Sequence, residues 1–131
     1  MDMSRSSWVE PSAEQIEERL PVWESLSEFF LDTELQPDDH ERIARTLAAT
    51  RFGIDELDSI LIGEVCPVCK WNLLAIAGEW AGFDSGWLKE KLTPYYGKRP
   101  RLRFLYVIRH RWMYERQWRK IRARISAIRG Q

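Results

Sequence analysis

Two cysteines at CxxC spacing are the first residues of this chain whose types and spacing could do chemistry. Cys66 and Cys69 form a Cys-Pro-Val-Cys motif, which could supply half of a zinc site or a redox couple. A structural zinc ion needs four ligands. The chain has no second CxxC, and His40 and His110 lie far apart in the sequence. A thioredoxin-like motif would follow a strand, and no strand pattern precedes Cys66. We therefore expect two apolar thiols packed in a buried helix, with no metal and no cofactor.

The charges form a second pattern, because the neutral 131-residue chain is strongly polarised. Residues 1–64 carry 16 acidic and 5 basic side chains, a balance of −11, whereas residues 65–131 carry 4 acidic and 15 basic ones, a balance of +11. Such asymmetry indicates a charged partner. It is equally consistent with an acidic half that folds against a basic half. Both interpretations stay open at this point.

Carboxylates and two tryptophans form a candidate protein-binding surface. Many of the carboxylates fall in the first turns of predicted helices, where they cap the helix or complement its dipole. A carboxylate cluster can also engage the basic active site of an effector, and tryptophan is enriched among interface anchors. Trp8 precedes the first helix cap, so we expect its side chain to be exposed. The candidate partner-binding residues are Glu34, Asp38, Asp39, Glu41, Asp55, Asp58, Trp8 and Trp87.

The basic side chains cluster near the C-terminus, where twelve lie between residues 98 and 131 beside the single acid Glu115. Aromatic residues are interleaved with them. Such a row of basic and aromatic side chains can bind the phosphates of a nucleic acid or an anionic membrane surface. A solvated helix face, whose long basic side chains cover apolar neighbours with their stems, produces the same pattern. The candidate nucleic-acid-binding residues are Arg109, Arg116, Arg119, Lys120 and Arg124.

The spacing of the apolar residues predicts the elements that position these groups. Steps of three and four predict an all-α single domain over residues 1–131, with a core at about 12–93. Ser12 and Gln15 form a capping box for the first helix, and Pro37 suits the first position of the second. The fourth helix is apolar on nearly every side, which predicts a central position. The sixth would form a basic rod about 40 Å long. The six expected helices cover about 13–31, 37–50, 55–65, 67–81, 85–92 and 101–128.

Several classes of protein are disfavoured by what the sequence lacks. No apolar run approaches the roughly 18 residues of a membrane span, and the N-terminal residues contain no apolar signal segment. Two cysteines without such a signal indicate a reducing compartment, so we expect a cytoplasmic protein. No nucleotide-binding, hydrolase or metalloprotease motif is present, so we do not expect an enzyme.

Four stretches of sequence resemble an uncharacterised family of small bacterial proteins, a domain of unknown function. They are RLPVWESLSEFFLDTEL (Arg19–Leu35), RIARTLAA, EVCPVC and NLLAIAGEWAGFD (Asn72–Asp84). The resemblance covers about residues 13–92 and implies no activity. Small stand-alone domains of this kind resemble immunity proteins, which neutralise a toxin delivered by neighbouring cells, and this link is one of analogy.

The sequence therefore predicts a protein-binding module, most concretely an immunity-type protein that neutralises a bacterial toxin or effector by direct binding. The alternative is a small nucleic-acid-binding protein that uses the arginine-rich C-terminal helix. The partner and the oligomeric state are not specified by the sequence.

Overall fold

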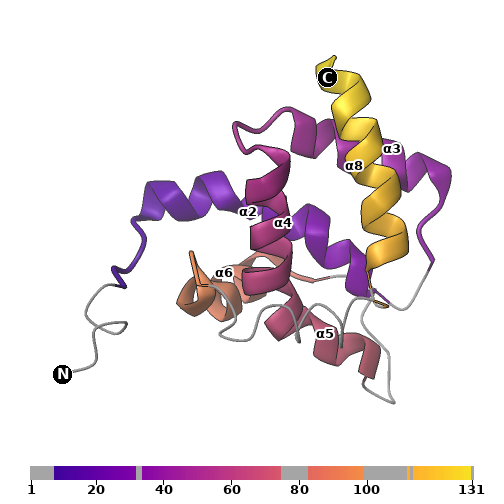
Figure 1. The fold of residues 1–131 in the computed structure, drawn as a ribbon. Coiled ribbons are helices and arrows are strands. Elements are labelled where there is room, and N and C mark those ends of the chain that lie inside the picture. Colours follow the sequence, from indigo (N-terminus) through magenta and orange to yellow (C-terminus); the bar gives the residue numbers. More distant parts are fainter. Residues whose placement is uncertain (1–7, 32–33, 75–82, 99–111, 113, 131) are drawn as a thin grey trace.

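The computed structural model describes residues 8–31, 34–74, 83–98, 112 and 114–130. Over these residues the chain is helical and contains no strand, as the apolar spacing predicts (Figure 1). The α-helices are α2 (Ala13–Ser27), α3 (Pro37–Ala48), α4 (Ile54–Ile60), α5 (Cys66–Leu74), α6 (Ser85–Leu92) and α8 (Glu115–Arg129). A π-helical turn, Leu61–Val65, joins α4 to α5, and short 3₁₀ turns, Glu28–Phe30 and Thr93–Tyr95, follow α2 and α6.

The predicted start signals of the first two helices are confirmed. The Ser12 hydroxyl accepts from the amide of Gln15, and the Gln15 side chain accepts from the amide of Ser12, which completes the capping box. Pro21 lies inside α2 without ending it. Pro37 occupies the start of α3, where its missing N–H costs no helical hydrogen bond. Local chemistry therefore fixes where these two helices begin.

The third and fourth predicted helices form one continuous helical segment from Ile54 to Leu74, so the described residues form five separate helical rods rather than six. The break expected at Pro67 is replaced by the π turn immediately before it. Pro67 has no N–H for the carbonyl of Gly63, so the hydrogen-bond ladder is already interrupted there. The cap also differs from the expected Asp55, because Glu56 accepts from the amide of Gly53 and the helix begins at Ile54.

The predicted helix over 101–128 is not confirmed as one rod. Helix α8 begins at Glu115, because Tyr114 has φ −137° and is not helical. The Tyr114 ring is buried against Phe30, with 6.5 Å between the ring centroids. Helix α8 ends at Gly130, whose φ of +75° lies in the left-handed region that favours glycine. Residues 99–111 and 113 lie outside the described part of the chain.

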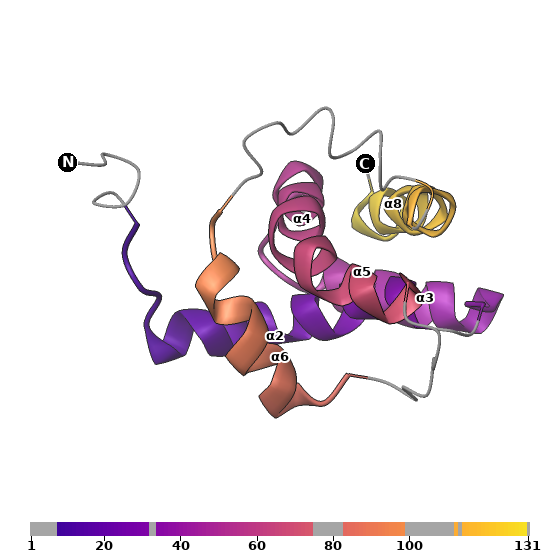
Figure 2. The same cartoon turned by 90° about the horizontal axis from the view of Figure 1, so that it is seen from below.

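The helices pack so that α8 lies alongside α3, while α6 packs against α2. Seen from below, α4 lies between α6 and α8 (Figure 2). Helices α3 and α8 run parallel, since Glu34 contacts Arg116 at one end and Arg129 contacts Leu47 at the other. No helix of the described residues is long and apolar enough to cross a membrane.

The core lies where α2, α3, α4 and α8 meet, and most inward positions predicted from the sequence are buried. Trp23, Trp118 and Phe30 are its largest fully buried side chains. Ile128 and Trp112, which continue the apolar spacing of the predicted last helix, are 38% and 67% exposed. The expected central helix at 67–81 is described only up to Leu74, and its Cys69 is fully buried. The predicted inward residues found buried are Leu26, Ile43, Ala44, Leu47, Leu57, Ile60, Leu61, Val65, Leu88, Leu92, Ile121 and Ile125.

Candidate functional site

The predicted acidic and basic sites face each other across the contact between α3 and α8. The Arg124 guanidinium donates to the Glu41 carboxylate, with 2.5 Å between Nε and Oε1. At the beginning of both helices, Glu34 and Arg116 form a looser ion pair at 3.7 Å. The opposite charges of the two halves therefore meet within one molecule. This agrees with the interpretation that the acidic half of the chain folds against the basic half.

Further carboxylates of the predicted acidic site are also engaged by the protein itself. Asp39 accepts from the amide of Gln36 at 2.8 Å and from Arg42 at 3.2 Å. These hydrogen bonds, the backbone one first, hold the pKa of Asp39 below its usual range. Asp58 accepts from the indole N–H of Trp118 at 3.0 Å, which ties α4 to α8. Asp39 and Asp58 thus have structural roles.

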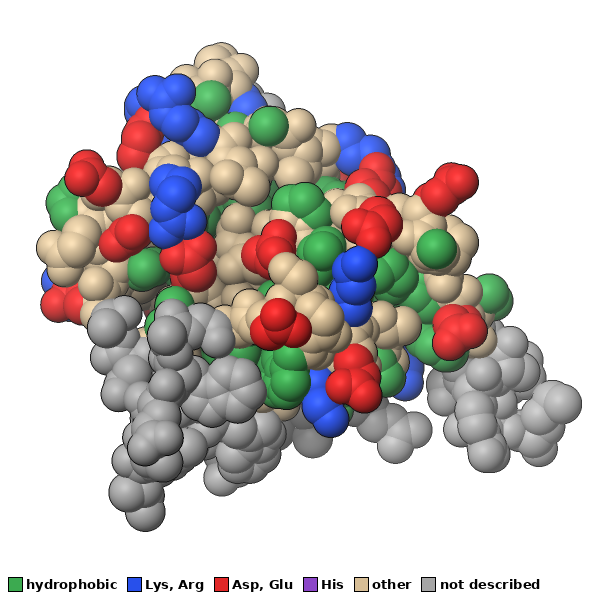
Figure 3. Space-filling model, turned by 180° about the vertical axis from the view of Figure 1, so that it is seen from behind, with side chains coloured by type: hydrophobic (Ala, Val, Ile, Leu, Met, Phe, Trp, Pro, Cys, Tyr) green, Lys and Arg blue, Asp and Glu red, His purple; other side chains and the backbone are tan. Residues whose placement is uncertain are grey.

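Asp38 and Asp55 remain exposed but do not form one patch. Asp38 lies in the first turn of α3, and Asp55 follows the far end of the same helix. A 12-residue helix is about 18 Å long, so the predicted acidic surface is divided. Figure 3 shows one face of the molecule on which Asp and Glu side chains alternate with Lys and Arg rather than gathering alone.

The exposed side of α8 carries the described members of the predicted nucleic-acid site. Arg116 and Arg124 pair with carboxylates of the acidic half, and Arg119 pairs with Glu115 at 3.6 Å. Lys120 is exposed and has no ion pair with the described residues. Arg109 lies outside the described residues. Most of the cationic charge on this helix is therefore matched by nearby carboxylates.

The two predicted tryptophan anchors are half-buried, so the expectation that Trp8 is exposed is wrong. The Trp8 indole N–H donates to the carbonyl of Tyr96 at 2.9 Å, and the Lys98 ammonium lies 5.1 Å from the indole ring centroid. Trp87 packs against Phe83, with 5.4 Å between ring centroids. Both indoles therefore make contacts within the protein that contribute to its fold.

Trp112 is the exposed tryptophan that sequence reasoning missed. It precedes α8 by three residues, and 67% of its surface is exposed. The residue lies at helical spacing from its apolar neighbours, so the sequence pattern counts it among the apolar positions of one long helix. The non-helical backbone at Tyr114 breaks that spacing. The unusual length of the predicted helix over 101–128 was the one feature of the sequence that argued against a single continuous helix.

Both cysteines are fully buried, as the packing interpretation expects. Burial, and secondarily the neighbouring Cys66, raises the pKa of the Cys69 thiol far above its usual range. A thiol held protonated is a poor nucleophile and a poor metal ligand. Among the described residues, no cluster of three or more His, Cys, Asp and Glu side chains could hold a metal ion.

A buried ion pair lies at the floor of a small pocket between α2 and the α4–α5 segment. The Arg19 Nη1 and Glu64 Oε2 atoms are 2.5 Å apart, and both side chains are at most a tenth exposed. Glu64 also accepts from the indole of Trp23 and from the amide of Gly97, each at 2.8 Å. The Arg19 Nε has no acceptor among the described residues. A buried donor without a partner costs about 1–3 kcal/mol.

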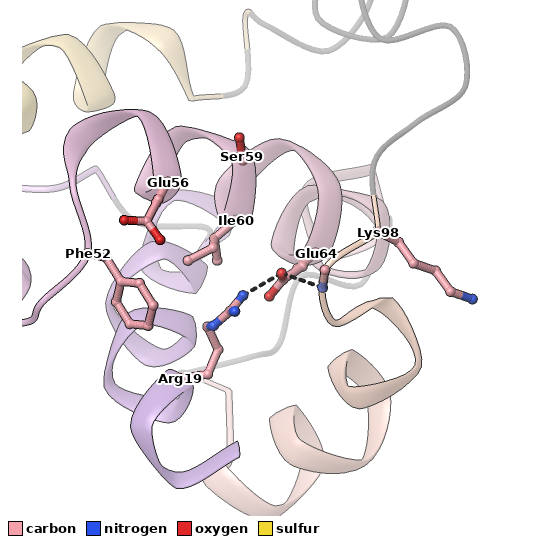
Figure 4. Close-up of a pocket in the computed structure, with 8 residues that line it drawn as sticks. Arg19, Phe52, Glu56, Ser59, Ile60, Glu64 and Lys98 are labelled. Atoms are coloured by element: carbon pink, nitrogen blue, oxygen red, sulfur yellow. Dashed lines mark hydrogen bonds and ion pairs between the residues drawn. The ribbon is translucent and has the colours of Figure 1, made fainter. Parts of the chain in front are cut away.

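The pocket has a cavity volume of about 140 Å³ (Figure 4). The guanidinium carbon of Arg19 lies 4.0 Å from the ring centroid of Tyr96 and 5.2 Å from that of Phe52. Glu64 reaches this position from the π turn, a type of distortion that is frequent at functional sites. The cavity is lined by Arg19, Phe52, Glu56, Ser59, Ile60, Glu64, Gly97 and Lys98.

Sequence reasoning selected neither Arg19 nor Glu64 as a site residue. A signal for Arg19 was present, because Ile16, Arg19 and Trp23 recur at steps of three and four and therefore share one helix face. A charged residue on an otherwise apolar face indicates a buried partner of opposite charge.

Comparison with protein families places the chain in a family. A model described as a domain of unknown function, DUF7079, matches residues 17–124. The chain belongs to this family, which confirms the resemblance to an uncharacterised domain. Neither the curated proteins nor the solved structures contained a match to the chain.

Proposed function

We propose that this chain is a protein-binding module without enzymatic activity, which acts in the bacterial cytoplasm. In its most specific form, it is an immunity-type protein that neutralises a toxin or effector by direct contact. The proposal concerns one surface, the N-terminal end of the α3–α8 pair, which we define by Glu34, Asp38, Trp112 and Arg116.

The exposed indole of Trp112 is the observation that carries the proposal. Residues whose removal costs most binding energy in protein interfaces are enriched in tryptophan and arginine. Trp112 is 67% exposed, and Arg116 follows it at the start of α8 with a side chain that is 73% exposed. The carboxylates of Glu34 and Asp38 lie at the matching end of α3. An apolar anchor beside charges of both signs suits a protein surface better than a uniformly anionic polymer.

Affinity capture from the native strain tests this proposal. The full chain, its Trp112→Ala variant and a Val9→Ala control serve as baits, because Val9 is also exposed, at 79%. We expect a specific protein to be retained by the full chain and the control and lost with Trp112→Ala. The recovered protein, expressed alone, should be toxic unless the full chain is co-expressed. A partner that Trp112→Ala retains with unchanged affinity would contradict the assigned surface, and a non-toxic partner would contradict the immunity role.

The nucleic-acid alternative rests on the exposed cations of α8, of which Lys120 has no ion pair with the described residues. Binding to phosphates would weaken steeply with salt, because each neutralised phosphate releases counterions. Replacing Arg116, Arg119 and Lys120 together by glutamine should then flatten the dependence of affinity on salt. The absence of binding to duplex or single strands at low salt would eliminate this alternative.

A further inference from the structure

Three features coincide at the pocket between α2, α4 and the Tyr96–Lys98 loop. The first is the buried Arg19–Glu64 pair, in which the Arg19 Nε finds no acceptor within the part of the chain that the structure describes. Buried pairs are often no more stabilising than apolar residues of the same size, so packing alone does not account for it. The second is the π turn that carries Glu64, and the third is the cavity that opens onto the pair. Together they indicate a binding site.

The distribution of charge around the cavity defines what could bind. The Glu64 carboxylate pairs with the Arg19 guanidinium and accepts two further hydrogen bonds, from Trp23 and Gly97. The floor of the cavity therefore carries no net charge. Glu56 and Lys98 lie on opposite sides of this floor (Figure 4). One carboxylate oxygen of Glu56 accepts a hydrogen bond from the amide of Gly53. Lys98 has no carboxylate partner among the described residues. The pocket therefore has an anionic side and a cationic side.

The Tyr96–Lys98 loop is held in place at several points. The Trp8 indole binds the carbonyl of Tyr96, and Glu64 binds the amide of Gly97. Gly97 has φ +73°, a conformation that other residues rarely adopt. In Figure 4 the Lys98 side chain extends away from the floor of the cavity, and its ammonium lies near the Trp8 ring. Its flexible four-carbon stem has to rotate for the ammonium to reach a ligand in the cavity. A fixed backbone beside one flexible cationic side chain suits the capture of a small ligand.

We propose that this pocket binds a small zwitterion of the amino-acid class, with its ammonium group toward Glu56 and its carboxylate toward Lys98. The cavity volume of about 140 Å³ is below the roughly 300–1,000 Å³ of sites for drug-sized ligands, so the cavity suits a molecule about the size of an amino acid. The ring of Phe52 and the side chain of Ile60 supply apolar contact, and the half-buried Ser59 hydroxyl has no hydrogen-bond partner among the described residues. This site is independent of the proposed protein-binding surface.

Titration of the ¹⁵N-labelled full chain, followed by amide chemical shifts, tests the site. The probes are the common L-amino acids added singly, together with the amide and the N-acetyl derivative of any that bind. The variants are Glu56→Gln, which can still accept from Gly53, and Lys98→Met, which keeps an apolar stem against Trp8. Glu90→Gln and Lys91→Met on α6 are matched controls, because both side chains are exposed away from the cavity lining.

At least one amino acid is expected to shift the amides of Gly97 and Ser59 saturably. The amide derivative lacks the carboxylate charge of the amino acid and the N-acetyl derivative lacks its ammonium charge, so each should bind at least about tenfold more weakly. The variants Glu56→Gln and Lys98→Met should weaken binding of the amino acid by at least the same factor. The control variants should bind as the unmodified chain does, and all variants should keep its melting temperature. The proposal is overturned if no amino acid shifts these amides at millimolar concentration, if the derivatives bind equally well, or if the pocket variants bind unchanged.

Discussion

The Arg124 Nε and the Glu41 Oε1 lie 2.5 Å apart, although Glu41 belongs to the acidic half of the chain and Arg124 to the basic half. The same carboxylate accepts from Arg45 on its own helix at 2.6 Å. The contact joins α8 to α3 and shows that part of the charge polarity serves folding. The surface left for a partner is therefore smaller than the sequence indicates.

Arg129 anchors the end of α8 on the end of α3, so its loss should destabilise the fold. We expect Arg129→Met to lower the free energy of unfolding by about 1–3 kcal/mol, since charged donors make stronger hydrogen bonds. Arg119→Met, an exposed control on the same helix, should stay within about 0.5 kcal/mol of the unmodified chain. Urea denaturation measures both, and equal effects would contradict the anchoring role. The carbonyls that Arg129 contacts belong to Leu47, Ala48, Thr50 and Phe52.

The ion pairs of the surface carboxylates predict a loss of stability in acid. A hydrogen bond from Arg51 holds the pKa of Glu18 below 4.5, and one from Arg124 does the same for Glu41. Because these pKa values are lowered on folding, their contribution is complete above the unfolded value of 4.5 and is lost as pH falls through the folded values.

Denaturation at about pH 7 and about pH 3 measures this effect. We expect the double variant Glu18→Gln, Glu41→Gln to lose less stability on acidification than the unmodified chain does. Added salt should also reduce the difference, because both pairs are exposed. An identical pH dependence in the double variant and the unmodified chain would show that these pairs do not contribute.

The buried Arg19–Glu64 ion pair predicts that substitutions of its two members have strongly non-additive effects on the free energy of unfolding. Glu64→Met leaves the Arg19 charge buried without a partner, and removal of one member of such a pair costs about 3–5 kcal/mol. The double variant Arg19→Met, Glu64→Met removes that charge and should recover at least half of the loss. Urea denaturation of the two variants provides the comparison. A double variant as unstable as Glu64→Met alone would mean that packing or the bonds to Trp23 and Gly97 dominate.

The buried cysteines should be inert in the folded protein. Burial raises the pKa of Cys69, so a disulfide reagent should label the thiols only at the rate at which the chain unfolds. We also expect the purified protein to contain no stoichiometric zinc, and Cys66→Ala with Cys69→Ala to fold. Rapid labelling under native conditions, or equimolar zinc in elemental analysis, would be inconsistent with the packing role.

The helices were largely predictable from sequence because their signals are local. Ser12 with Gln15 and Pro37 each act within one turn, and their effects were visible without tertiary structure. The same holds for Asp84, whose carboxylate accepts from the amide of Trp87 and caps α6. Burial at Ile43 and Leu47 followed from helical spacing alone.

The candidate sites were less predictable because they depend on distant contacts. Arg19 and Glu64 are 45 residues apart, and a π turn has no strong local signature, so nothing in the sequence joined them. Pro67 suggested a boundary that the continuous helix does not have. Exposure of Trp112 depends on the break at Tyr114, whose ring packs against the distant Phe30.

Site-specific photo-crosslinking tests the proposed protein-binding surface most directly. A photoreactive residue is placed at the exposed Lys120, one helical turn after Arg116 in α8, or at the exposed control position Glu90 on α6, in full chains that keep Trp112 and are expressed in the native strain. The proposal predicts that one protein is crosslinked from position 120 and not from position 90, and that Trp112→Ala and Asp38→Lys each reduce its yield. No crosslinked protein from position 120, or the same protein in equal yield from both positions, would contradict it.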